Sequence, residues 1–434
     1  MLEKMEPKAF WTVKRITLSK LTYLQAAGMA LVFGTNVYLT NALSNEQYGL
    51  YVSIVQGIVL LSILLIGGLD ELITVEVPQL LKKGDLASAN GMHRWSNRTI
   101  VRRFAILVLT VSLILVCYFI LTGKYVLTIT DLIVAGGSVL CTSFLLKQVS
   151  ELRSTGNYTI GQFLESVIRP LGILLLLILM INLLGIDATA SNALIVLLIV
   201  LLLTTFTAQF LLHRLQPYLR RIDECALPTS AAQWTGKNRL SAFNGSSILY
   251  FLITKLDLLL IVILESTASV GQYNVAGRLA EWCMLPAVIL NMAYTREVSE
   301  SSLHETDQRI PKLVRNLIGK SALFTTIMGA ILLISGVWLL PLFGENYSRG
   351  YSLLFPLTAS YLLMATAAPI NHWLKVKGME SQSLRIAGIV VLAQSLTCGA
   401  LIVLFGPMGA AWGMLLTNVL YFGLLLQAVK SIRV

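Results

Sequence analysis

Charged residues are scarce in this sequence. They make up 13% of the 434 residues, whereas hydrophobic residues make up 56%, and the mean hydropathy is +0.75. Ordinary soluble domains contain about 25% charged residues. The composition therefore excludes an ordinary soluble protein and predicts a polytopic membrane protein.

Histidine and cysteine are scarce as well. The chain has 4 His and 5 Cys, and none of them shows the spacing of metal ligands. Four of the cysteines fall in apolar runs, so no disulfide framework is indicated. We therefore expect neither a metal site nor a cofactor.

Two features typical of enzymes are missing. No Gly-rich phosphate-binding motif that ends in Lys-Ser or Lys-Thr is present, which argues against an ATPase in this chain. The segments predicted to lie outside the cell are short, as in NALSNEQYG and TGKYVLTIT. A polymerase or ligase that acts on lipid-linked sugars usually carries its catalytic groups on a long outer loop. We therefore expect that the protein is not an enzyme.

Long apolar runs, in contrast, are abundant. A helix needs about 20 mostly apolar residues to cross roughly 30 Å of hydrocarbon. The runs predict an all-α integral membrane protein with about 12 transmembrane helices. They cover residues 21–43, 50–69, 104–122, 131–147, 160–182, 192–212, 240–264, 272–295, 320–342, 351–374, 385–405 and 409–429.

The positive charges fall on one side of this topology. With the N-terminus inside, and with the span-end residues Lys147, Lys320 and Arg385 counted in the inner segments that they border, 28 of the 33 Lys and Arg lie in inner segments, two in outer loops, and three in spans. Because Lys and Arg collect in cytoplasmic loops, we expect both termini to be cytoplasmic. The inner loops also account for the net charge of +11, so no nucleic-acid partner is needed to explain it.

The polar and basic segment 213–239 divides the chain into two halves of six spans each. We expect an N-terminal six-helix lobe at 1–212, a cytoplasmic linker at 213–239 and a C-terminal six-helix lobe at 240–434. Six spans per half give both halves the same orientation. Such lobes are related by a pseudo-two-fold axis along the membrane normal, as in transporters that work by alternating access.

A short match between the halves supports an internal repeat. Gln47 and Tyr48 follow the first span, and Gln272 and Tyr273 follow the seventh. The spacing that aligns these two pairs also aligns the first inner loop of one half with the first inner loop of the other. This interpretation favours a transporter over a scaffold made of two packed bundles.

Four ionisable residues lie in the seventh and eighth predicted spans: Lys255, Asp257, Arg278 and Glu281. A charge at bilayer depth costs at least about 2.5–3.5 kcal/mol, so it usually faces a partner or a wet cavity. Positions 255 and 257 lie about 200° apart around a helix. The two side chains therefore cannot both face the eighth span. In one arrangement, Asp257 meets Arg278, and Lys255 points to another partner or to the outer headgroups. Alternatively, Lys255 meets Glu281, and Asp257 points elsewhere.

The fifth span carries a second polar stripe. Gln162, Glu165, Ser166 and Arg169 share one helical face, and Pro170 follows. Glu165 and Arg169 have the spacing of an intrahelical ion pair, which would bind the helix to a neighbour. The alternative is a cationic site for an anionic head group, because the Arg guanidinium suits phosphate oxygens.

Five segments, taken in order, carry a family resemblance: LTNALSNEQYGLYVSIVQGI, TKLDLLLIVILESTASVGQYNVAGRLAEW, LFGENYSRGYSLLFPLTASYLLM, WLKVKGMESQSLRIAG and FGPMGAAWGMLLTNV. They resemble the signatures of bacterial polysaccharide flippases of the O-antigen (Wzx-like) type, in the multidrug/oligosaccharidyl-lipid/polysaccharide exporter superfamily. The resemblance runs from about residue 20 to residue 429. Asp257, Gly271 and Tyr273 match the family pattern D…G-x-Y, which is mainly structural.

The resemblance implies transport of an undecaprenyl-pyrophosphate-linked oligosaccharide across the bacterial cell (inner) membrane for polysaccharide biosynthesis, with lipopolysaccharide O-antigen or exopolysaccharide as products. It also implies membrane lipids, and possible polysaccharide polymerase and glycosyltransferases, as partners, and coupling to H⁺ or Na⁺.

The site residues follow from the span charges rather than from the resemblance. We assign substrate binding to Arg169, Lys255 and Arg278, and ion coupling to Glu165, Asp257 and Glu281. Two alternatives remain open: a cation-coupled multidrug antiporter of the same superfamily, and a non-transporting membrane scaffold.

Overall fold

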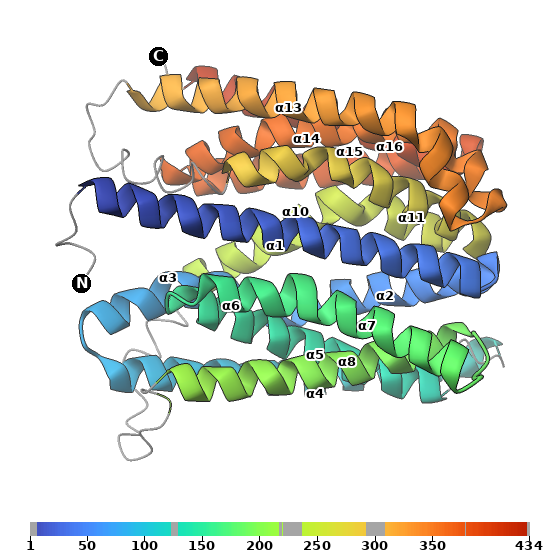
Figure 1. The fold of residues 1–434 in the computed structure, drawn as a ribbon, viewed down its shortest axis with the longest axis horizontal. Coiled ribbons are helices and arrows are strands. Elements are labelled where there is room, and N and C mark those ends of the chain that lie inside the picture. The colour runs from blue at the N-terminus through green and yellow to red at the C-terminus, as the bar shows by residue number, and fades with distance from the viewer. Residues whose placement is uncertain are drawn as a thin grey trace. The chain divides into compact units, whose positions relative to one another are not determined.

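A computed structural model describes residues 7–122, 129–216, 219, 237–291, 309–377 and 379–431. Within these ranges the chain forms helices and no strands (Figure 1). The longer helices are α1 (Pro7–Ala42), α2 (Asn45–Ile66), α3 (Leu69–Lys82), α4 (Leu86–Thr122), α5 (Ile129–Ser154), α6 (Tyr158–Phe163), α7 (Arg169–Ile178), α8 (Ala190–Leu215), α10 (Lys237–Leu264), α11 (Thr267–Glu281), α13 (Arg309–Leu339), α14 (Tyr351–Val376), α15 (Glu380–Phe405) and α16 (Pro407–Ser431).

Nine segments of the described chain are long and apolar enough to cross a membrane: Asn45–Ile66, Thr130–Ser154, Tyr158–Leu183, Ala190–Leu215, Ser247–Leu264, Val314–Phe343, Glu345–Leu374, Ser381–Phe405 and Pro407–Val429. Each overlaps a span predicted from the sequence. The all-α membrane architecture is therefore confirmed.

The three other predicted spans fall on α1, α4 and α11. The predicted span at 272–295 is not one uninterrupted α-helix. α11 ends at Glu281, a 3₁₀ turn follows at Trp282–Met284, and helix resumes over 285–291. A 3₁₀ turn inside a helical segment tightens the chain locally and often marks a hinge or a strained site.

The structure divides into two compact units by its internal contacts. Unit 1 comprises Met1–Ser53 and Leu249–Val434, and unit 2 comprises Ile54–Ile248. These units differ from the predicted lobes, because α1 and the start of α2 belong with the second half of the chain. The symmetric division into two six-helix lobes stays a prediction.

In unit 1, α14 packs against α11, α13 and α16, and α15 packs against α16 (Figure 1). Small residues permit close packing, which matters in a membrane because lipid tails are as apolar as leucine. A Cβ atom at Gly409 would lie 1.9 Å from the carbonyl oxygen of Leu401. Only glycine fits where α16 turns back along α15.

The start of α2 packs against the start of α11 through a second glycine contact in unit 1. A Cβ atom at Gly49 would lie 1.7 Å from the carbonyl oxygen of Thr267, and one at Gly271 would lie 3.1 Å from the ring of Tyr48. The two backbones therefore approach almost without intervening side chains.

In unit 2, α5 packs against α8 and α3. The end of α2 shows how local chemistry terminates a helix. Gly67 and Gly68 have φ angles of 51° and 73°, which glycine adopts without the Cβ clash of other residues. Arg103 of α4 donates from Nη1 to the carbonyl oxygens of Leu65 (3.1 Å) and Ile66 (2.8 Å). The guanidinium thus satisfies two of the carbonyls that a helix end leaves unpaired.

Candidate functional site

The short connection between α10 and α11 brings the predicted span charges together in unit 1. α10 ends at Leu264 and α11 begins at Thr267. Ser266 caps α11, because its side-chain oxygen accepts from the backbone N–H of Ser269 at 3.3 Å. The two helices are therefore antiparallel neighbours, as the sequence predicts.

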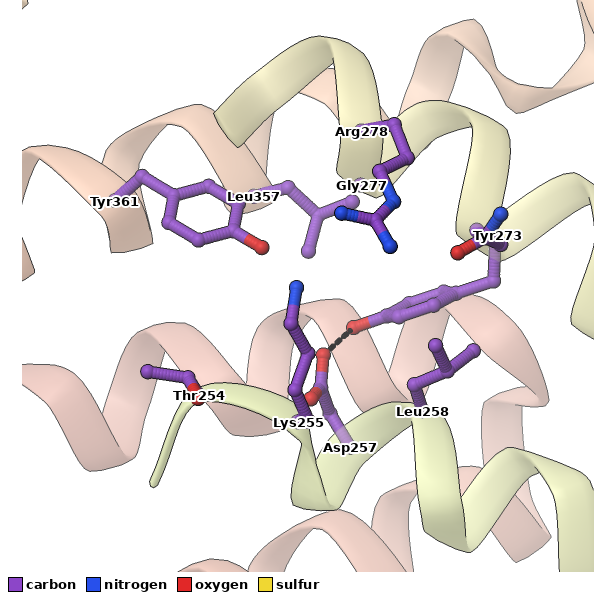
Figure 2. Close-up of a pocket in the computed structure, with 10 residues that line it drawn as sticks. Thr254, Lys255, Asp257, Leu258, Tyr273, Gly277, Arg278, Leu357 and Tyr361 are labelled. Carbon is purple, nitrogen blue, oxygen red and sulfur yellow. Dashed lines mark hydrogen bonds between the residues drawn. The ribbon is translucent and has the colours of Figure 1, made fainter. Parts of the chain in front are cut away.

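A small pocket that is partly open to its surroundings lies beside this hairpin. Residues of α10, α11 and α14 line it: Thr254, Lys255, Asp257, Leu258, Tyr273, Asn274, Gly277, Arg278, Leu357 and Tyr361. Figure 2 shows the amine of Lys255 and the guanidinium of Arg278 directed into the space below the Tyr361 and Leu357 side chains. The charged residues of the lining are two cations and one carboxylate.

Asp257 is held at the wall of the pocket by a tyrosine. The hydroxyl of Tyr273 donates to Asp257 Oδ2 at 2.5 Å (Figure 2), and the Asp257 side chain is buried, with only 4% of the residue exposed. Oδ1 of the same carboxylate is buried and accepts no hydrogen bond from the described residues. One oxygen of Asp257 thus remains available to a proton or a cation.

Glu281 joins the two cations of the pocket. Its Oε2 accepts from Lys255 Nζ at 3.4 Å and from Arg278 Nη1 at 3.3 Å. These three side chains are about one-fifth to one-third exposed, and both distances are long for charge-assisted hydrogen bonds. A stronger anion can therefore compete with Glu281 for both cations.

The structure selects one of the two arrangements predicted for these charges. Lys255 meets Glu281, and Asp257 does not meet Arg278. Asp257 nevertheless stays on the α11 side, because it binds Tyr273. The prediction considered only charged partners, and the tyrosine hydroxyl supplies a neutral one.

Tyr361 of α14 belongs to the pocket, although no sequence pattern singled it out. It lies within an apolar run, where an aromatic residue normally indicates core packing. Asn274 was missed for a similar reason, since it sits beside the Gln-Tyr pair as one more small polar residue.

The second predicted cluster lies in unit 2, and its pairing differs from the prediction. Glu165 does not pair with Arg169: its Oε2 accepts from Arg153 Nη2 of α5 at 2.5 Å. The same Arg153 nitrogen donates to Gln162 Oε1 at 3.0 Å, and Gln162 donates to Ser166 Oγ at 2.6 Å. The expected intrahelical ion pair is wrong because α5 and α6 pack side by side and offer Glu165 a closer arginine.

Arg169 is consequently left over. In the part of the chain that the structure describes, its guanidinium makes no hydrogen bond or ion pair. Arg169 is half-buried and follows a π-helical segment, Leu164–Ile168. Pro170, the next residue, has no N–H to donate, and a wider helical turn is one way to accommodate that loss. Single π turns occur frequently at functional sites.

The sequence analysis missed one further group of charges. The predicted span at 131–147 ends at Lys147 and leaves Glu151 outside it, whereas both residues lie on α5 and are buried together with His93 of α4. Their spacing of four residues, next to an apolar run, was the signal that indicated a shared face. Within the described residues, no group of three His, Cys, Asp or Glu side chains has the arrangement of a metal site.

Solved structures share this fold. The chain is similar to an inward-facing multidrug resistance MATE family transporter of the MOP superfamily, at 14% identity and a TM-score of 0.73, over 93% of this chain and 94% of that one. An outward-facing structure of such a transporter matches at 15% identity and a TM-score of 0.68, over 96% and 95%.

A third match is a MOP-superfamily transporter from Pyrococcus furiosus, described as having a binding pocket of reverse polarity. It has 13% identity and a TM-score of 0.67, over 96% and 95% of the two chains. No protein-family model and no curated protein sequence matches the chain. The chain therefore has the fold of MATE transporters of the MOP superfamily, and the narrower resemblance to Wzx-like flippases stays a prediction.

Proposed function

We propose that the protein is a flippase that moves an undecaprenyl-pyrophosphate-linked oligosaccharide across the bacterial cell membrane by alternating access. The observation that carries this proposal is the lining of the pocket, where Lys255 and Arg278 face one carboxylate. Among the lining residues the cations outnumber the carboxylates, and Glu281 holds both cations only at long distances, so the pocket suits a pyrophosphate better than an organic cation.

The geometry suggests how the substrate binds. Arg278 presents a planar guanidinium that can bond two phosphate oxygens at once, and Lys255 adds a point charge. Both are held by a single oxygen of Glu281 at 3.3 to 3.4 Å. The pyrophosphate displaces Glu281 from the cations, and the isoprenoid tail stays in lipid.

Ion coupling is assigned to the carboxylates. Asp257 offers a buried, unpartnered oxygen, and Glu281 is released when the substrate takes its cations. Both the buried oxygen of Asp257 and the released carboxylate of Glu281 can take up H⁺ or Na⁺. In unit 2, Arg169 is the cation that we assign to substrate binding, and Glu165, bound to Arg153, is the third candidate for ion coupling.

The remaining parts of the proposal rest on the sequence. The distribution of Lys and Arg supports cytoplasmic termini, and the family resemblance supports a polysaccharide polymerase and glycosyltransferases as partners.

A leaflet assay tests the proposed function. The protein is reconstituted into vesicles with a lipid-linked oligosaccharide, and a membrane-impermeant glycan-modifying reagent reports the outer leaflet. We expect protein-dependent exchange between leaflets, and a loss of at least tenfold in rate for Arg278→Ala. Arg349→Ala, which removes an exposed arginine outside the pocket, is the matched control. Wild-type vesicles without exchange would overturn the proposal.

A multidrug antiporter is the second candidate, favoured by the MATE fold and by the unpartnered oxygen of Asp257. It predicts ion-driven uptake of a cationic dye by the same vesicles, with loss of uptake in Asp257→Asn and little effect of Arg278→Ala. Arg278→Ala therefore distinguishes the candidates, because it should abolish flipping but spare uptake of the dye.

A further inference from the structure

Three ionisable side chains meet in the interior of unit 2, and none of them is a residue of the pocket lining. Lys147 and Glu151 of α5 are 0% and 1% exposed, and His93 of α4 is 6% exposed. Ionisable groups are almost never buried to this degree unless they are paired. The positions of these residues in the sequence do not explain why three ionisable side chains are buried together.

The three groups touch one another in a triangle. Lys147 Nζ lies 2.8 Å from Glu151 Oε1 and 2.8 Å from His93 Nδ1. His93 Nδ1 lies 2.9 Å from both oxygens of Glu151. Each side of the triangle is a hydrogen-bond distance, so each side needs one donor and one acceptor.

No single arrangement of protons satisfies all three sides while Lys147 and Glu151 are both charged. If His93 Nδ1 carries a proton, it donates to Glu151 but opposes the N–H groups of the Lys147 ammonium. If Nδ1 carries a lone pair, it accepts from Lys147 but faces the negative carboxylate. One contact is unfavourable in either tautomer.

Loss of one proton removes this conflict. When the Lys147 ammonium becomes an amine, its lone pair faces the Nδ1–H of His93, its N–H donates to Glu151, and the proton goes to solvent. Asn97 supports this tautomer, because its amide nitrogen lies 3.2 Å from His93 Nε2 and can donate to it. The released form, however, carries one buried negative charge without a compensating cation, which is also unfavourable. The protonated form therefore contains one unfavourable contact, and the released form contains one uncompensated buried charge.

The neighbouring helices carry further titratable groups, and within the described hydrogen bonds and ion pairs none of these groups bonds to the three side chains. His213 of α8 lies edge-to-face with His93, with ring centroids 6.3 Å apart. Gln148 of α5 donates to Gln209 of α8 at 2.9 Å. On the α6 side, Glu165 is bound to Arg153. α3 packs on α5 and carries the acidic residues Asp70, Glu71 and Glu76.

We propose that His93, Lys147 and Glu151 form a proton-binding site whose ligand is one exchangeable proton. Binding and release change the hydrogen bonds between His93 of α4 and the two α5 residues. The bound form favours separation of His93 from Lys147, and the released form holds them together. Proton binding is thereby linked to the packing of α4 against α5, whichever substrate the pocket takes.

Histidine-selective NMR tests the site directly. The chain has 4 His, and the signal lost in His93→Gln identifies His93 in ¹⁵N-histidine-labelled protein. We expect the nitrogen shifts of His93 to change between pH 5 and pH 10 in the wild type. In Lys147→Arg the part of the change at alkaline pH, above the range in which an imidazole itself takes up a proton, should disappear, because an arginine cannot release its proton there.

A second variant covers a failure of Lys147→Arg to fold. The double variant K147M/E151Q removes both charges of the pair at once and leaves no single buried charge. We expect its thermal midpoint to depend less on pH than that of the wild type, whereas a merely structural role would lower the midpoint equally at every pH. His213→Gln is the control and should keep the alkaline change of the His93 signals. His93 shifts that stay constant at alkaline pH in the wild type, or that change there equally in Lys147→Arg or K147M/E151Q, would overturn the proposal.

Discussion

Tyr48 and Tyr273, the tyrosines of the two Gln-Tyr pairs, make the same kind of hydrogen bond. Tyr48 of α2 donates to Asn36 Oδ1 of α1 at 2.8 Å, and Tyr273 of α11 donates to Asp257 Oδ2 of α10 at 2.5 Å. In both cases the hydroxyl reaches back to the helix that precedes its own. This recurrence favours an internal repeat in which a neutral amide and a carboxylate occupy comparable positions.

The comparison predicts how Asp257→Asn behaves. Because Asn36 already accepts from a tyrosine in the equivalent contact, an asparagine at 257 should keep the hydrogen bond from Tyr273. We expect a thermal midpoint within a few degrees of the wild type in detergent, together with loss of ion-dependent transport. Unchanged ion dependence would show that Asp257 has no coupling role.

Tyr273→Phe, in contrast to Asp257→Asn, should lower the stability of the protein. It removes the donor and leaves the buried Asp257 carboxylate without this partner, which costs about 1–3 kcal/mol of the free energy of unfolding. The measurement is thermal unfolding, with Tyr23→Phe as control because Tyr23 is 75% exposed. A Tyr273→Phe midpoint equal to that of the control would contradict the importance of this contact.

Glu281→Gln tests the competition between Glu281 and an anionic head group. The substitution leaves Lys255 and Arg278 without their shared carboxylate. We expect inorganic pyrophosphate to bind about tenfold more tightly, equivalent to about 1.4 kcal/mol, as measured by calorimetry in detergent. Glu345→Gln, an exposed carboxylate outside the pocket, should leave the affinity unchanged. Equal affinities for both variants would argue against an anion site at these cations.

The contact between α2 and α11 gives a prediction of stability. Gly49→Ala places a methyl group 1.7 Å from the carbonyl oxygen of Thr267, and overpacking of this kind typically costs about 1–3 kcal/mol. Gly57→Ala on the same helix meets no atom within 4 Å, so it should be neutral or stabilising by up to about 1 kcal/mol. The measurement is the thermal midpoint of each variant. Equal midpoints would show that α2 and α11 separate easily at this contact.

The cap formed by Arg103 gives the last prediction. Arg103→Ala exposes the carbonyl groups of Leu65 and Ile66, and we expect a loss of about 1–3 kcal/mol in the free energy of unfolding. Arg102→Ala, at an exposed neighbouring position, should change stability by less than about 0.5 kcal/mol. If both variants unfold at the same midpoint, solvent or lipid headgroups replace the cap.

Hydropathy was sufficient to predict the helical architecture, because each membrane-spanning helix needs its own long apolar run. Helical geometry also gave the pairing of Lys255 with Glu281 as one of two alternatives. It did not predict the hydrogen bond between Tyr273 and Asp257. The angular positions of residues around one ideal helix do not reveal which neutral side chains a neighbouring helix places nearby.

Partners from other helices explain the remaining differences. The spacing of Glu165 and Arg169 describes a single helix, whereas Arg153 reaches Glu165 from α5. The predicted span stops at Lys147 and leaves Glu151 outside it, because hydropathy ends a span at the first charge. The tertiary contact with His93, which lies more than fifty residues earlier in the chain, cannot be predicted from local composition.

The π-helical turn at Leu164–Ile168 also affects how this chain should be compared with its relatives. Such a turn contains one residue more than the α-helical turn it replaces, so residues after it are rotated by about 100° relative to an uninterrupted helix. A relative without the turn would present a different face of α7 from the same nominal position. Sequence alignments across this region therefore need a one-residue gap before Arg169 and its counterparts can be matched.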